Sequence, residues 1–238
     1  MELKDIKIKD YKLIDNAVKK YKIDKNDSKL EQSFIDILKL NDLPITETNK
    51  IIKKLFESFS ADLNDDLSNF VYRDKKHKLI DFGDDIVGRF IDADNYFDEP
   101  NLISNFMVAV FKINNEEYNG TVDKKLWFDD LPATYFIYAK NKFINYKETC
   151  YSRFKYLYRA NDEDNSNTQL NGNIKLGGLS EEEFENEFGW YGKLYIYSKE
   201  QYMSIKDVTN KISADEFLYF INFYKRKCEL DNERIRNH

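Results

Sequence analysis

The stretch "LPATYFIYAKNKFINYKETCYSRFKYLYRA", residues 131–160, decides the fold class. Its apolar residues recur at steps of three or four, which places them on one face of a helix. Pro132 stands near the start, where proline is common in the first turn of a helix. We therefore predict one long amphipathic helix. Its apolar face comprises Phe136, Ala139, Phe143, Tyr146, Cys150, Phe154 and Leu157.

Helix signals also dominate the flanking sequence. The capping box at Ser28–Glu31 predicts that a helix starts at Ser28. An apolar stripe from about Thr46 to Phe70, spaced by threes and fours, predicts a second helix. Ser180 and Ser213 are each followed by a glutamate three residues later, so we expect two further helices to start at these serines.

Residues 78–130 give no single pattern. The run "MVAVFKI", residues 107–113, fits a buried strand as well as a buried helical turn. We therefore expect a mainly α protein, a helical bundle with a small irregular or β-containing insertion around residues 78–130. The expected organisation is an N-terminal helical region at 1–75, a central region at 76–160 ending in the long helix, a polar linker at 161–178 and a C-terminal helical region at 179–238.

Composition narrows the cellular setting. The 238 residues carry a net charge of −6, and no apolar run is longer than six residues, so we expect neither a signal peptide nor a membrane span. The two cysteines are far apart, which favours reduced thiols. Charge is distributed in blocks: residues 60–130 carry 8 basic and 16 acidic side chains, whereas residues 131–160 carry 6 and 1. Such blocks could pair complementary protein surfaces or simply be solvated.

The stretch "HKLIDFGDDIVGRF", residues 77–90, contains Asp81-Phe82-Gly83, the tripeptide with which protein kinases hold Mg²⁺. A kinase also needs a glycine-rich loop upstream to cover the nucleotide phosphates. Gly83 is the first glycine of the chain, so that loop is missing. We conclude that phosphoryl transfer is excluded and that Gly83 marks a bend.

Other catalytic and metal-binding patterns are incomplete. The acidic run at 92–100 has Phe97 where a calcium loop requires glycine. His77 and His238 have no second ligand at zinc spacing. Cys150 and Cys228 lie on apolar helix faces, where a free cysteine behaves as a small hydrophobe. We therefore expect a non-enzyme without catalytic, cofactor-binding or metal-binding residues.

The basic segment 131–160 interleaves cations with tyrosines, a combination that can contact phosphates and stack on bases. On a helical wheel these cations scatter around the helix instead of forming one face, so contact with nucleic acid is the weaker reading. The candidate residues for a weak nucleic-acid contact are Lys142, Arg153, Lys155 and Arg159.

Two longer stretches carry a resemblance. Residues 79–120, "LIDFGDDIVGRFIDADNYFDEPNLISNFMVAVFKINNEEYNG", resemble a segment of poorly characterised morphogenesis proteins of tailed bacteriophages, in which an "FG-x-FID…Y" run precedes an apolar core and a "YNG" turn. Residues 188–233, "FGWYGKLYIYSKEQYMSIKDVTNKISADEFLYFINFYKRKCELDNE", resemble the ending of the same proteins. The chain departs from the pattern at Phe111-Lys112-Ile113, where an arginine-proline pair should follow the apolar core.

The resemblance implies a non-enzymatic structural component of the virion, in a neck or portal-proximal ring or in the tail. Its expected partners are other phage structural proteins and further copies of itself, in a ring. We expect it to contact no membrane and to bind no cofactor. Its expected location is the virion and, during assembly, the host cytoplasm. Two alternatives stay open: a tail assembly chaperone that leaves the particle, and a small soluble binding module such as an antagonist of a defence system. The candidate interface residues are Phe217, Ile221, Tyr224, Trp190 and Tyr191.

Overall fold

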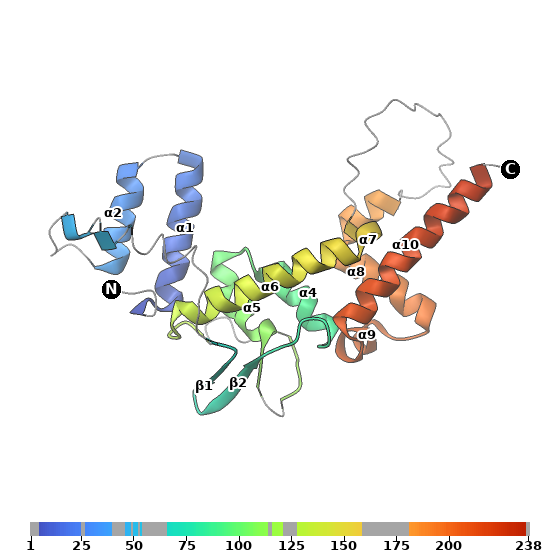
Figure 1. Ribbon diagram of the computed structural model, residues 1–238, viewed down its shortest axis with the longest axis horizontal. Helices are drawn as coiled ribbons and strands as arrows, with labels where there is room; N and C mark the ends of the chain where they lie inside the picture. The colour runs from blue at the N-terminus through green and yellow to red at the C-terminus, as the bar shows by residue number, and fades with distance from the viewer. Residues whose placement is uncertain are drawn as a thin grey trace. The chain divides into compact units, whose positions relative to one another are not determined.

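The structure, a computed structural model, is mainly α with one small three-stranded antiparallel sheet, which confirms the predicted fold class (Figure 1). The linker predicted at 161–178 and most of the helix predicted from Thr46 lie outside the described residues. The structure describes residues 5–24, 27–39, 46–48, 50–51, 53, 66–113, 116–120, 128–158 and 181–236.

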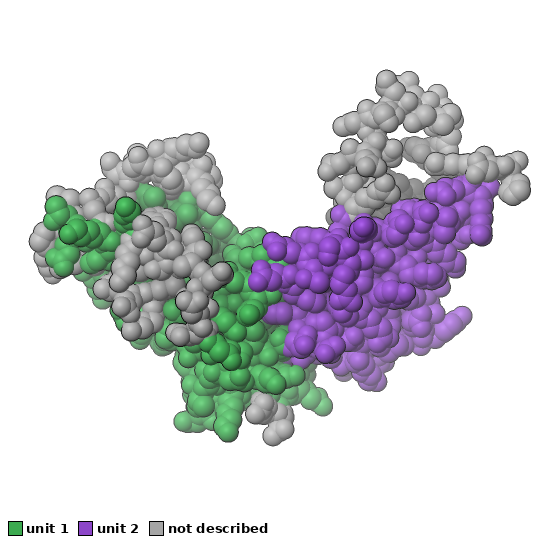
Figure 2. All heavy atoms as spheres, in the orientation of Figure 1, with its two compact units in different colours: residues 1–80, 92–144 green, residues 81–91, 145–238 purple. Residues whose placement is uncertain are grey.

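The chain forms two compact units, coloured separately in Figure 2. Unit 1 comprises residues 1–80 and 92–144, and unit 2 comprises residues 81–91 and 145–238. Each unit is therefore assembled from two separated stretches of chain. The four consecutive regions expected from the sequence stay a prediction.

Unit 1 begins with a helical hairpin of α1 (Ile8–Asp24) and α2 (Asp27–Leu38), which lie side by side (Figure 1). Helix α2 begins at Asp27, within one residue of the predicted start at Ser28. Ile14 of α1 and Phe34 of α2 are fully buried. Burying each such side chain contributes roughly 1.5–3 kcal/mol.

Helix α5 (Ile103–Val110) follows the short 3₁₀ turn η2 (Pro100–Leu102), and all eight of its residues are buried. A helix that is apolar on every side is a core helix. The chain continues directly into strand β3 (Phe111–Ile113). The ambiguous run at 107–113 is thus both structures in turn, the end of a buried helix followed by a short strand.

The sheet consists of β1 (Asn69–Tyr72), β2 (Lys75–Leu79) and β3, in that order, with both pairs antiparallel. Leu67 and Phe70 are therefore not helical, and the predicted helix does not extend to Phe70. The reason is the tight turn at 73–74, which folds the chain back so that Phe70 stacks on His77 with 5.0 Å between ring centroids.

The start of α1 in unit 1 is bound to the start of α6 (Ala133–Arg153), which is most of the long helix predicted at the outset. The prediction that this helix continues through Phe154 to Leu157 is wrong, because Phe154 is not helical and a separate single turn follows it. The amide of Ile8 donates to the carbonyl of Leu131 at 2.9 Å, and the amide of Ala133 donates to Ile6 at 2.7 Å. Lys7 and Pro132 form an antiparallel bridge between these bonds. First-turn amides have no partner inside their own helix, so this exchange satisfies one in each helix.

Unit 2 contains the end of α6, the single turn α7 (Lys155–Tyr158), α8 (Glu181–Gln201), α9 (Ile205–Lys211) and α10 (Ala214–Arg236). It also contains the first five residues of α4 (Val87–Tyr96). Its core is centred on α10, where Phe217, Leu218 and Ile221 are buried. The ring of Tyr197 on α8 packs 5.5 Å from that of Phe217.

The helix starts of unit 2 follow the predicted chemistry. The Ser213 hydroxyl accepts the amide of Glu216 at 3.2 Å, which confirms the cap of α10. Helix α8 begins at residue 181, and Ser180 itself lies outside the described residues. The sequence reading missed α9, although Ser204 caps it by accepting the amide of Asp207 at 3.0 Å. Helix α8 is kinked at Gly189, whose φ of 50° and ψ of −125° are not helical.

The hairpin turn yields a test. Arg73 and Asp74 have φ values of 50° and 60°, and Tyr72 pairs with Lys75 across a two-residue loop. This geometry favours Asn-Gly. Replacing both residues, Arg73→Asn with Asp74→Gly, should raise the free energy of unfolding by about 1 kcal/mol because left-handed backbone is costly for most side chains. Urea denaturation measures the change.

The control for this turn is Asp74→Ala, which keeps the loop length but places a residue that disfavours positive φ. It should lower the free energy of unfolding by about 1 kcal/mol. A double variant that is no more stable than Asp74→Ala would contradict the assigned turn.

Candidate functional site

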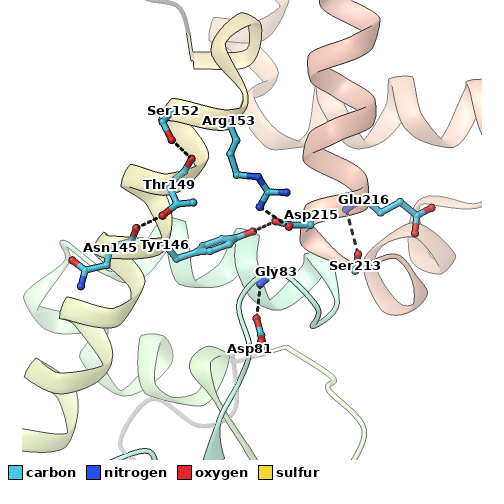
Figure 3. A network of polar contacts seen from close by, with 10 residues as sticks. All are labelled: Asp81, Gly83, Asn145, Tyr146, Thr149, Ser152, Arg153, Ser213, Asp215 and Glu216. Carbon is cyan, nitrogen blue, oxygen red and sulfur yellow. Dashed lines mark hydrogen bonds and ion pairs between the residues drawn. The ribbon is translucent and has the colours of Figure 1, made fainter.

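The Asp81-Phe82-Gly83 stretch lies against the start of α10 in unit 2 (Figure 3). The Gly83 amide donates to the Asp81 carboxylate at 3.2 Å, which closes a tight turn. The amide of Asp215 then donates to the carbonyl of Gly83 at 3.0 Å. The stretch that resembles a magnesium-binding loop therefore works as a docking segment for a helix.

Two more backbone hydrogen bonds fix this docking. The amide of Ala214 donates to the Asp85 carbonyl at 2.9 Å, and the amide of Val87 donates to the Ile212 carbonyl at 2.8 Å. Ile86 and Ser213 form an antiparallel bridge between these bonds. The segment that precedes each of the helices α4 and α10 thus accepts hydrogen bonds from the first residues of the other helix.

The carboxylate of Asp215 is the centre of a polar network, and Figure 3 shows the residues that converge on it. Tyr146 of α6 donates its hydroxyl to Oδ1 at 2.8 Å. Arg153, two turns further along α6, donates Nη1 to Oδ2 at 2.7 Å. The two carboxylate oxygens each receive a donor, so α6 and α10 are joined by charge-assisted hydrogen bonds.

Protonation explains what this network can do. Burial raises the pKa of the Tyr146 phenol far above its ordinary value, and burial raises the pKa of the Cys150 thiol to about 11. The hydrogen bond to Asp215 raises the pKa of Arg153. Phenol and thiol therefore stay protonated at neutral pH, and a protonated thiol is a poor nucleophile. The arrangement suits holding helices together.

Gly83 is required by this network. A Cβ atom at Gly83 would lie 3.0 Å from the carboxylate carbon of Asp215. The carboxylate is held by its bonds to Tyr146 and Arg153, so any movement away from Gly83 would distort those bonds. The bend inferred from sequence is therefore a close approach of backbone to a fixed side chain.

This close approach can be measured with a double-mutant cycle. Gly83→Ala should lower the free energy of unfolding by about 2 kcal/mol because the added methyl overpacks against the carboxylate. In an Asp215→Ala background the same change should cost less than about 0.5 kcal/mol, since the obstacle is gone. Equal costs in the two backgrounds would show that the contact is not responsible.

The buried thiol offers a second measurement. Cys150 is inaccessible and its pKa is raised, whereas Cys228 is half-buried. In single-cysteine variants made by Cys→Ala substitution, iodoacetamide at pH 8.5 should alkylate Cys150 at least about tenfold more slowly than Cys228. Both should react alike after unfolding in urea. Similar rates in the native protein would contradict the burial of Cys150.

The candidate interface residues occupy different environments. Phe217 and Ile221 are buried inside unit 2, so their side chains are core. Trp190 and Tyr224 are half-buried. The indole of Trp190 packs edge to face on Phe90, with 5.4 Å between ring centroids. Tyr191 is exposed, with 58% of its surface accessible.

Sequence reasoning missed a set of exposed aromatic residues on α10. Tyr219 is 67% and Phe223 is 57% exposed, and Leu230 is also exposed. Their spacing of four and seven residues places them on one helix face. Beyond Ile221, none of residues 222–235 is buried. The signal was present in the sequence as a second apolar stripe beside the one formed by the core residues.

Helix α8 also carries exposed aromatics. Tyr191 and Tyr195 are spaced by four residues. Phe188 lies just before the kink at Gly189, and Tyr202 directly follows the last residue of the helix. Lys193 lies over the Trp190 ring, with Nζ 5.3 Å from its centroid. Exposed aromatic side chains are typical of protein interfaces.

The candidate nucleic-acid residues do not share one role. Lys142 is exposed and its ammonium lies 5.4 Å from the centroid of the Tyr138 ring. Lys155 is exposed, whereas Arg153 is paired with Asp215. Arg159 lies outside the described residues. Arg153 is thus committed to a contact within the chain.

Two other kinds of feature are metal-ion sites and membrane-spanning helices. Within the described ranges, no cluster of three or more histidine, cysteine, aspartate or glutamate residues could hold a metal ion. The helices of the described part of the chain include none that is long and apolar enough to cross a membrane.

Comparison of the chain with protein-family models, curated proteins and solved structures found no match.

Proposed function

We propose that this chain is a non-enzymatic structural component of a tailed-phage virion, a neck or portal-proximal ring or tail protein, which acts through protein–protein contacts. The observation that carries the contact role is the exposed face of α10 with Tyr219, Phe223 and Leu230. Scattered exposed apolar residues are normal on any surface, whereas two aromatic residues and a leucine aligned on one helix face are what a protein-binding surface would present.

The chemistry of the polar network supports the same role. Its carboxylate is occupied by two donors and its phenol and thiol are protonated, so its contribution is to rigidity. A rigid unit that presents a fixed helix face is suited to repeated contacts in an assembly. The phage assignment itself rests on the resemblance of residues 79–120 and 188–233.

The proposal is tested with a phage whose genome encodes the chain with Tyr219→Glu and Phe223→Glu. Both side chains are exposed, so the purified variant should melt within about 3 °C of the wild type. The yield of infectious particles should fall at least about tenfold because the charges oppose burial at an interface. The matched control is Asn232→Glu, an exposed change on the same helix, which should leave the yield unchanged.

Mass spectrometry of purified particles separates the alternatives. Peptides of this chain in mature particles, at a constant ratio to the other structural proteins, are the expected result. Their absence would sink the virion-component proposal, and a chain bound only to immature assemblies would indicate a chaperone. A normal particle yield from the double variant would remove α10 as the interface.

A further inference from the structure

Residues 69–97 and 115–143 are related to each other without a gap, at a separation of 46 residues. Ten of the 29 aligned positions are identical. Shifting the alignment by one residue in either direction leaves three or two identities. The identical pairs are Asn69 and Asn115, Tyr72 and Tyr118, Lys78 and Lys124, Phe82 and Phe128, Asp84 and Asp130, Phe90 and Phe136, Ile91 and Ile137, Ala93 and Ala139, Asn95 and Asn141, and Phe97 and Phe143.

Four of the identical pairs are buried in both segments, whereas Phe97 is half-buried and its counterpart Phe143 is fully buried. Phe82 and Phe128, which precede helices α4 and α6, are both buried. The Phe-Ile-x-Ala run that each helix carries is also buried, at residues 90–93 and 136–139, apart from its third position. Identical residues in identical environments indicate equivalent positions in a fold.

The backbone contacts at the two helix starts agree as well. In unit 2 the amide of Val87 donates to Ile212, and in unit 1 the amide of the aligned Ala133 donates to Ile6. The reciprocal bonds from α10 and α1 also correspond. The amide of Ala214 donates to Asp85, and correspondingly the amide of Ile8 donates to Leu131. The amide of Asp215 donates to Gly83, and correspondingly the amide of Lys9 donates to Asp129. The bridge between Ile86 and Ser213 corresponds to the bridge between Pro132 and Lys7.

The segments before the helices share a position with positive φ, since Asp74, with a φ of 60°, aligns with Gly120. The tight turn at Arg73-Asp74 aligns with Asn119-Gly120, where Gly120 has a φ of 82°. Asn-Gly is the sequence that two-residue hairpin turns favour. The correspondence therefore extends from the turn, through the buried phenylalanine, to the third turn of the helix.

Many of the aligned positions that differ are partly or fully exposed in both segments, although the buried Val87 corresponds to Ala133 and the buried Arg89 to Tyr135. Asp94 corresponds to Lys140, and Tyr96 corresponds to Lys142. Core residues are constrained by packing whereas surface residues are free to change. A kept core with a changed surface is the pattern that duplication of a structural module leaves.

We propose that the chain contains two copies of one module. Each copy is a turn, a buried phenylalanine and a Phe-Ile-x-Ala helix whose start exchanges backbone hydrogen bonds with the start of a second helix. In one copy the start of α4 pairs with the start of α10, and in the other the start of α6 pairs with the start of α1. The two copies have similar buried residues but different charges at their exposed positions. One chain therefore presents two related surfaces that differ in charge.

Transplantation of the segment in the full chain tests the proposal. Residues 81–97 are replaced by residues 127–143, with Gly83 and Gly88 retained because a Cβ at Gly88 would lie 2.8 Å from the Thr209 carbonyl oxygen. The control carries residues 126–142 instead, a shift of one residue. The aligned chimera should melt cooperatively within about 10 °C of the wild type, and the shifted chimera should show no cooperative transition. Equal behaviour of the two chimeras would overturn the proposal.

Single proline substitutions test the shared helix starts without a chimera. Proline is normally tolerated at the first helical position, but Val87→Pro and Ala133→Pro each remove an interhelical hydrogen bond. Val87→Pro should melt about 5 °C or more below Val87→Ala, and Ala133→Pro should melt about 5 °C or more below the wild type. The control is Ile205→Pro against Ile205→Ala at the ordinary start of α9, which should differ little. A loss at only one of the two aligned positions, or equal losses at all three, would contradict the shared module.

Discussion

The exchange of backbone hydrogen bonds between helix starts is the constraint on which both units depend. A helix leaves its first amides without internal partners, and most proteins satisfy them with caps or water. In this chain the first amides of α4 and α10, and those of α1 and α6, donate to the segments that lead into each other. Because these segments are distant in sequence, each bond also closes a long loop. The pairing sets where α1, α4, α6 and α10 begin.

Side-chain interactions then add to what the backbone has fixed. In unit 2 the Asp215 carboxylate joins α6 to α10 through Tyr146 and Arg153. In unit 1 the Asp129 carboxylate accepts Ser104 of α5 at 2.8 Å and pairs with Lys12 of α1. In both units a carboxylate beside the paired helix starts reaches a further helix. The pair of Lys12 and Asp129 is the more shielded of the two ion pairs, and breaking it would leave a partly buried charge without its partner.

Much of the helical structure could be read from the sequence, and the failures have physical causes. Helix α6 was predictable because its apolar face continues for many turns and because Pro132 marks its start. Phe70 was misassigned because Leu63, Leu67 and Phe70 match helical spacing by accident, while the hairpin turn uses Arg73-Asp74 in place of a recognisable Asn-Gly. Periodicity identifies an apolar face without saying whether the chain itself covers it.

The candidate site was beyond local reasoning for a related cause. Tyr146 and Asp215 are 69 residues apart, and no spacing rule connects them. Phe217 was correctly recognised as part of an apolar face, but that face is core, and the exposed face of α10 is a neighbouring one. The sequence did hold one long-range signal, the 46-residue repeat, which helix-by-helix reading does not reveal.

The kink of α8 at Gly189 has a consequence in terms of handedness. The space around this glycine is open, with no atom within 4 Å of where a side chain would begin, so packing does not demand glycine. The demand comes from φ and ψ of 50° and −125°, values that are the mirror image of ordinary extended backbone. A D-amino acid would adopt these dihedral angles as readily as an L-amino acid adopts ordinary extended backbone. The position therefore requires one chirality of backbone, and glycine is the only residue of the natural set that supplies it.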